Sequence, residues 1–117
     1  MNYEIIEKND KKYIKIREVI VCENDIIDII GICISNDINI VLLEKDTFSD
    51  DFINLKSGLA GIALQKFMNY YIKMSIIIDK NKVEGRFKEL VYELNQTNTF
   101  KVFFDSEDAE NWIFNIK

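Results

Sequence analysis

Ile40-Val41-Leu42-Leu43 is a run of four apolar residues from which the architecture of this chain can be argued. A strand that is apolar at every position has no polar side to turn to water, so it must be covered on both faces. Polar residues bound the run, with Ser35-Asn36-Asp37 upstream and Glu44 directly after it. The pattern over Ile38–Leu43 therefore predicts a central strand of a sheet that carries helices on its faces.

Upstream of this strand, the pattern predicts a β-hairpin and then a helix. Tyr3–Glu7 and Lys12–Arg17 are typical of strands, and Asn9-Asp10-Lys11 between them is typical of a turn, because Asn and Asp tolerate left-handed backbone. Val19-Ile20-Val21 is a candidate for a further short strand. Apolar residues at three- and four-residue spacing predict a helix over Glu23–Ile34.

Downstream, helix and strand patterns alternate. One helix is predicted from a Ser49-Asp50-Asp51 cap to Asn69, with a break near Ser57 as the alternative. Further helices are predicted over 83–95 and 106–116, and strands over 71–78 and 99–104. A helix between two strands is the usual connection of parallel strands. The prediction is an α/β fold: a single domain of 117 residues in which an N-terminal β-hairpin and alternating helix–strand units form a mixed sheet packed with helices.

The composition excludes several kinds of chemistry. The chain has no histidine, which excludes a Ser-His-Asp triad, a Cys-His pair and a His-ligated metal site. A net charge of −5 argues against a nucleic-acid partner, which needs a basic face. Cys22 and Cys33 do not make a disulfide framework, and their spacing is not that of a zinc site. We find no nucleotide-binding glycine motif and expect neither a cofactor nor a metal.

The start of the chain predicts a location. Met1-Asn2-Tyr3-Glu4 lacks the basic segment and apolar run of a signal peptide. No stretch approaches the 18 uncharged apolar residues of a membrane span. We therefore expect a cytoplasmic protein without a membrane span.

Charged residues follow the predicted parallel strands, at the ends where open α/β sheets bind their ligands. They form a candidate interaction or ligand site: Asp50, Asp51, Lys56, Asp79, Arg86 and Asp105. A metal-dependent enzyme that uses this acidic rim is the least favoured reading, because acids at such positions are more often helix caps or solvated loop residues.

Two other features favour binding over catalysis. Lys73, Ser75 and Lys101 are expected to point to the same side of neighbouring strands, which indicates a thinly covered face for a partner protein or a second copy of the chain. Aromatic residues make up 12% of the chain. If apolar volume exceeds what the core can pack, a pocket for a small apolar, lipid-like ligand would lie between the sheet and the helix around Phe52–Phe67.

Several stretches of the chain resemble an uncharacterised bacterial family, domain of unknown function 4180. They are Ser49–Gly61, Leu64–Tyr70, Gly85–Glu89, Phe100–Phe104 and Glu107–Trp112. The resemblance covers most of the chain, and its motifs are specific to the family but carry no assigned chemistry.

More distantly, the order of elements is similar to that of the STAS domain, the fold of bacterial anti-sigma factor antagonists. In those proteins a partner kinase phosphorylates a serine at the start of a helix that follows a central strand. The nearest position here is Ser57, although Lys56 stands where that family has an aspartate and about a dozen residues separate Ser57 from Leu43. The resemblance implies a non-enzymatic regulatory or protein-interaction module with Ser57 as a candidate phosphorylation site. The binder of a small apolar ligand is the alternative.

Overall fold

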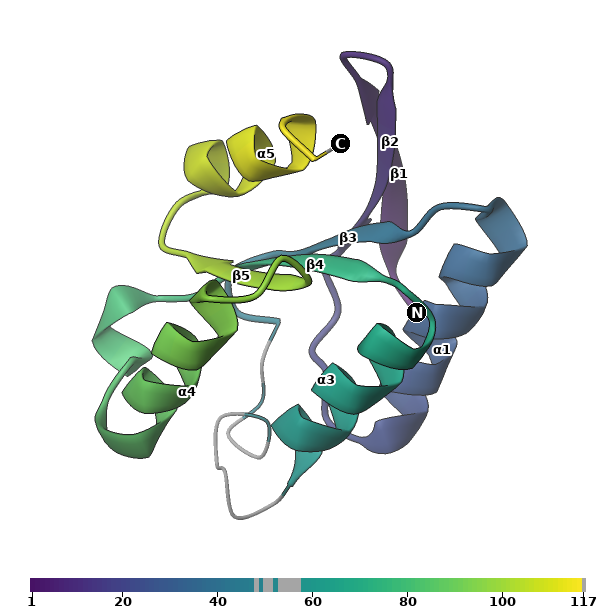
Figure 1. Cartoon of the computed structure of the whole chain (residues 1–117). Helices are drawn as coiled ribbons and strands as arrows, with labels where there is room; N and C mark the ends of the chain where they lie inside the picture. The colour runs from purple at the N-terminus through teal and green to yellow at the C-terminus, as the bar shows by residue number, and fades with distance from the viewer. Residues whose placement is uncertain (48, 50–51, 53–57, 117) are drawn as a thin grey trace.

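A five-stranded mixed sheet forms the centre of the molecule in a computed structural model (Figure 1). The structure describes residues 1–47, 49, 52 and 58–116, with the main chain alone at Arg86. The strands lie in the sheet in the same order as in the sequence: β1 (Tyr3–Lys8), β2 (Lys11–Ile16), β3 (Ile40–Leu43), β4 (Lys73–Ile77) and β5 (Phe100–Phe103). β1 and β2 form the predicted antiparallel hairpin, and β2 to β5 run parallel as predicted.

The hairpin closes through two residues with left-handed backbone. Asn9 has φ 52° and Asp10 has φ 63°, and the strands meet at the pair of Lys8 and Lys11. Two consecutive left-handed residues match the right-handed twist of the flanking strands. The candidate strand at Val19–Val21 is reduced to one bridge, in which the Ile20 N–H donates to the Thr47 carbonyl at 2.7 Å.

The helices form two unequal layers on the sheet (Figure 1). One face is covered by α1 (Glu23–Asn36), α3 (Leu59–Asn69) and α4 (Gly85–Asn95), and the other by α5 (Ser106–Phe114). α1, α3 and α4, which connect parallel strands, lie on the same face because the strand order never reverses, so each crossover is made in the same direction and with the same hand. A short 3₁₀ helix (Lys80–Lys82) occupies the turn expected after the fourth strand.

β3 confirms the prediction of a central strand. All four of its residues are buried. Val41 and Leu43 belong to the core beneath α1, α3 and α4, whereas Ile40 and Leu42 belong to the smaller core beneath α5. The uninterrupted apolar run is thus explained by two cores that share one strand.

The start of α3 corrects one expectation. The Ser49 Oγ accepts a hydrogen bond from the Phe52 N–H at 3.2 Å, as a capping serine should. The helix that runs to Asn69 nevertheless begins only at Leu59, after Gly58 adopts a left-handed φ of 74°. A left-handed residue interrupts a right-handed helix. The continuous helix from the Ser49 cap is therefore wrong, and a break close to the alternative position is correct. The other predicted elements agree with the structure to within two residues at each end.

Candidate functional site

The carboxylates at the strand ends are engaged locally. The Asp79 Oδ1 accepts from the Asn81 N–H at 3.0 Å and so caps the 3₁₀ helix. The Asp105 Oδ1 accepts from the Asp108 N–H at 2.8 Å and caps α5. Both residues follow parallel strands as predicted, but each side chain satisfies the backbone of its own helix.

The described part of the chain holds no group of three or more Cys, Asp or Glu side chains placed to bind a metal ion. The strand order gives a reason why the described acidic side chains form no such group. In doubly wound sheets the ligand crevice opens where the strand order reverses and neighbouring connections leave toward opposite faces. This sheet has no such reversal among its five strands.

Four of the candidate site residues, Asp50, Asp51, Lys56 and Ser57, lie outside the described residues. Arg86 lies in the first turn of α4. The roles suggested for these residues in ligand binding, and for Ser57 in phosphorylation, stay predictions.

The face that carries Ser75 is covered rather than open. Ser75 is fully buried, and its Oγ donates to the Ala109 carbonyl of α5 at 3.0 Å. Lys73 and Lys101 are half-buried, and the Lys101 ammonium donates to the Asn95 carbonyl at the end of α4. Among the described elements α5 is the one helix on this face, and Ser75 fixes it to β4.

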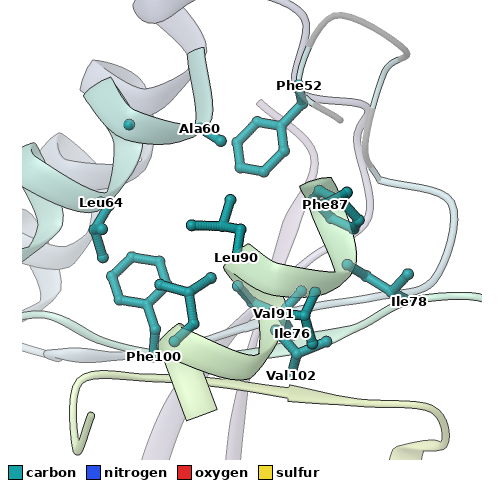
Figure 2. A pocket seen from close by; sticks show the side chains of 12 residues that line it. Phe52, Ala60, Leu64, Ile76, Ile78, Phe87, Leu90, Val91, Phe100 and Val102 are labelled. Atoms are coloured by element: carbon teal, nitrogen blue, oxygen red, sulfur yellow. The ribbon is translucent and has the colours of Figure 1, made fainter. Parts of the chain in front are cut away.

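An apolar pocket lies on the opposite face, between α3, α4 and the sheet (Figure 2). Its lining is apolar throughout: Phe52, Ala60, Gly61, Leu64, Ile76, Ile78, Phe87, Leu90, Val91, Leu94, Phe100 and Val102. The helices provide two walls, and β4 and β5 provide the floor. Figure 2 shows Leu90 in the middle of this group, with Phe52 and Ala60 on one side and Phe100 on the other.

Small residues on α3 make room for this pocket. Ala60 and Gly61 face the pocket where α3 approaches α4, and a Cβ at Gly61 would meet no atom within 4 Å. Gly61 is also exposed, so the pocket reaches the surface beside it. The space among the side chains is about 40 Å³. Since no lining side chain titrates or donates a hydrogen bond, the pocket can bury an apolar group but cannot move a proton.

Among the described residues, two titratable side chains are buried away from the pocket. Burial raises the pKa of the Cys33 thiol to about 11, so at neutral pH it is protonated and a poor nucleophile. Burial, followed by the charge of Glu110, also raises the pKa of Tyr13, whose hydroxyl donates to the Glu110 carboxylate at 3.1 Å. Neither group lines the pocket.

These features define a mixed α/β domain that has an apolar pocket and in which Asp79 and Asp105 cap helices. The chain belongs to the family described as Domain of unknown function (DUF4180), which it matches over residues 8–113. No curated protein and no solved structure matches it. The resemblance to this family is confirmed, whereas the likeness to STAS domains and the cytoplasmic location stay predictions. In the part of the chain that the structure describes, no helix has the length and apolarity to cross a membrane.

Sequence reasoning placed a pocket beside the helix around Phe52–Phe67 but did not include α4. Phe87, Leu90, Val91 and Leu94 supply a whole wall of it. The signal in the sequence is their helical spacing, which makes an apolar stripe within the helix predicted over 83–95. The stripe does not show that α4 lies beside α3, because that position follows from the strand order.

Proposed function

We propose that this protein is a non-enzymatic binding domain whose pocket takes the apolar part of a small ligand. The observation that carries the proposal is a wholly apolar lining at the meeting of two helices and the sheet, open to the surface beside Gly61. Within the broader class of regulatory and interaction modules, this proposal names a small molecule as the bound partner.

The size of the space limits what enters it. A volume of about 40 Å³ is far below the roughly 300 to 1,000 Å³ of pockets that enclose a drug-sized ligand. A ligand therefore inserts the end of an alkyl chain, and a deeper insertion requires α3 and α4 to separate. Each buried methylene contributes about 0.8 kcal/mol.

The lining also favours an apolar group over water. A buried water needs two to four polar partners, and the side chains of this pocket offer none. An alkyl chain that enters the pocket loses its own contact with water and displaces no hydrogen-bonded solvent. Affinity should accordingly follow chain length rather than headgroup chemistry.

Straight-chain alcohols from butanol to decanol test the proposal, since they are neutral and differ only in apolar length. We expect methyl NMR signals of Leu64 and Leu90 to shift on titration, with affinity rising about fourfold per methylene until the space is filled. Gly61→Leu should abolish the shifts, because its side chain enters open space at the pocket without displacing a neighbour.

Gly31→Leu is the matched control. Gly31 is also a helical glycine whose Cβ would meet no atom within 4 Å, but it lies in α1 and does not line the pocket. It should bind the alcohols as the unmodified protein does. Equal binding by Gly61→Leu, or shifts confined to methyls outside the pocket, would contradict the proposal.

The other candidate functions have less support. Asp79 and Asp105, which a metal-dependent enzyme would need on the acidic rim, already cap helices. A kinase-regulated role depends on Ser57. The intact mass of protein purified from cells tests that role, which requires a shift of one phosphate that maps to Ser57.

A further inference from the structure

The two edges of the sheet differ in their main-chain hydrogen bonding. At the β5 edge, the Asn95 side chain of α4 acts in place of a neighbouring strand: its Oδ1 accepts from the Val102 N–H at 2.7 Å, and its Nδ2 donates to the Val102 carbonyl at 3.5 Å. This contact blocks the middle of a four-residue edge strand. The other edge is β1, which has six residues.

The main-chain groups at the β1 edge can be assigned residue by residue. The Asn2 carbonyl accepts from the Arg17 N–H at 3.3 Å, which places Asn2 among the residues bonded to the β2 side. Because bonding direction alternates along an antiparallel strand, the N–H and C=O groups of Tyr3, Ile5 and Glu7 point outward. An open edge of this kind is a template for another strand.

Two of these three outward residues, Tyr3 and Ile5, carry exposed apolar side chains, and the third, Glu7, is charged. Tyr3 is 40% exposed and Ile5 is 43% exposed. They lie opposite Ile16 and Ile14, whose side chains are in the core beneath α1, so they project on the α1 side of the sheet. Natural sheets guard such edges with proline, with bulges or with charged side chains. β1 contains no proline, and its charged residues are Glu4, Glu7 and Lys8.

α1 continues this apolar surface. Ile27, Gly31 and Ile34 follow one another at helical spacing on its outer side, and Ile27 and Ile34 are 48% and 63% exposed. A groove that Tyr3 and Gly31 help to line joins the strand to the helix. We define Tyr3, Ile5, Ile27, Gly31 and Ile34 as the edge patch. None of these five residues has a charged side chain, although Asp28 also lines the groove and the protein as a whole has a net charge of −5.

We propose that β1 pairs antiparallel with β1 of a second copy of this chain, so that two sheets join into one across a two-fold axis. A two-fold axis requires a surface that complements itself. With Ile5 opposite Ile5 of the other copy, Glu4 faces Ile6 and Glu7 faces Tyr3, so no carboxylate directly faces another. A register two residues closer to the N-terminus would place Glu4 opposite Glu4, and like charges directly opposite are destabilising.

Variants at Ile5 separate strand pairing from other contacts. Ile5→Pro removes an outward N–H but no hydrogen bond to β2, and Ile5→Lys places a charge at the two-fold axis while leaving the backbone intact. We expect the unmodified full chain to sediment with twice its 13.8 kDa mass at high concentration, and both variants to sediment as monomers across about 1 to 500 µM. Ile62→Lys is the matched control, because Ile62 is an exposed isoleucine on α3 outside the edge patch, and it should remain dimeric.

Hydrogen exchange gives a second readout. The amides of Ile5 and Glu7 should exchange slowly in concentrated samples of the unmodified protein and of Ile62→Lys. They should exchange at the rates of exposed amides in Ile5→Lys and on dilution. Circular dichroism should show that Ile5→Pro and Ile5→Lys are folded.

Two results would overturn the inference. One is a monomer at every concentration of the unmodified protein. The other is a dimer that survives Ile5→Pro, since it would show that the contact does not depend on pairing at β1; if Gly31→Arg then abolished that dimer, the contact would lie on α1. Both results leave alcohol binding at the pocket unaffected, so this inference is independent of the proposed function.

Discussion

Asp37 ends α1 in a left-handed conformation, with φ 53° and ψ 44°. Its N–H donates to the Ile34 carbonyl, and the next N–H, that of Ile38, donates to the Cys33 carbonyl at 3.0 Å. Glycine is the usual residue at such a position, because a side chain costs about 1 kcal/mol there. Aspartate also places a negative charge at the negative end of the helix dipole.

Asp37→Gly should therefore raise the free energy of unfolding by about 1 kcal/mol. The exposed position loses no packing when the side chain is removed. Urea denaturation measures the change, and Asp37→Asn, which removes the charge but keeps a side chain, should give a smaller rise. No rise with Asp37→Gly would mean that the left-handed turn costs nothing here.

At the scale of elements, local patterns explain most of what could be predicted. Some elements can be predicted from a few neighbouring residues because their local sequence determines their structure. Examples are the run Ile40–Leu43, the Asn9-Asp10 turn and the apolar stripe of α4. The start of α3 does not, because the apolar spacing includes both Phe52 and Leu59, whereas one left-handed backbone angle at Gly58 sets the residue at which the helix begins.

The candidate site was less predictable for the same reason. The acids at the strand ends were found from the sequence, but the choice between a shared site and separate caps depends on distances between elements. The wall that α4 adds to the pocket depends on strand order, which no single segment records. The sequence thus predicts the side chains that each element presents better than it predicts which elements contact one another.

Leu42→Asp tests the central role of β3. Leu42 is fully buried beneath α5, and an unpaired charge there costs several kcal/mol against a total stability of about 5 to 15 kcal/mol. We expect the variant not to fold, as measured by circular dichroism and by loss of a cooperative transition. Val21→Asp, at a site that is 53% exposed, should fold. Cooperative unfolding of Leu42→Asp near the midpoint of the unmodified protein would show that β3 is not central.

At the scale of the whole molecule, each of the two cores contains one buried side chain that can lose a proton at alkaline pH. Cys33 lies in the core beneath α1, α3 and α4, and Tyr13 lies in the core beneath α5. In both cases folding raises the pKa above that of the unfolded chain. The folded protein therefore favours the neutral form of each side chain, and alkaline pH destabilises both cores.

Stability should therefore be constant up to about pH 9 and fall between pH 9 and 11. In this window the unfolded chain releases the Cys33 proton while the folded chain retains it, which removes up to about 2 to 3 kcal/mol. Above about pH 10 Tyr13 adds to the loss in the same direction. Urea denaturation at several pH values measures the effect.

Two cysteine variants separate the contributions. Cys33→Ala should be less stable at neutral pH and show a smaller decline from pH 9 to 11, whereas Cys22→Ala, which removes an exposed thiol, should follow the unmodified protein. A decline of equal size in Cys33→Ala would assign the alkaline loss to other groups.

The Asn95 contact at the β5 edge has a consequence for how the protein is made. Each strand pairs only with its neighbours in the chain, so helix–strand units can dock one after another as they leave the ribosome. Asn95 precedes Val102 in the chain, so the amide that accepts the Val102 N–H leaves the ribosome before the last strand does. The final edge is thus closed to other nascent chains as soon as it forms, whereas the first edge stays open from the beginning of synthesis.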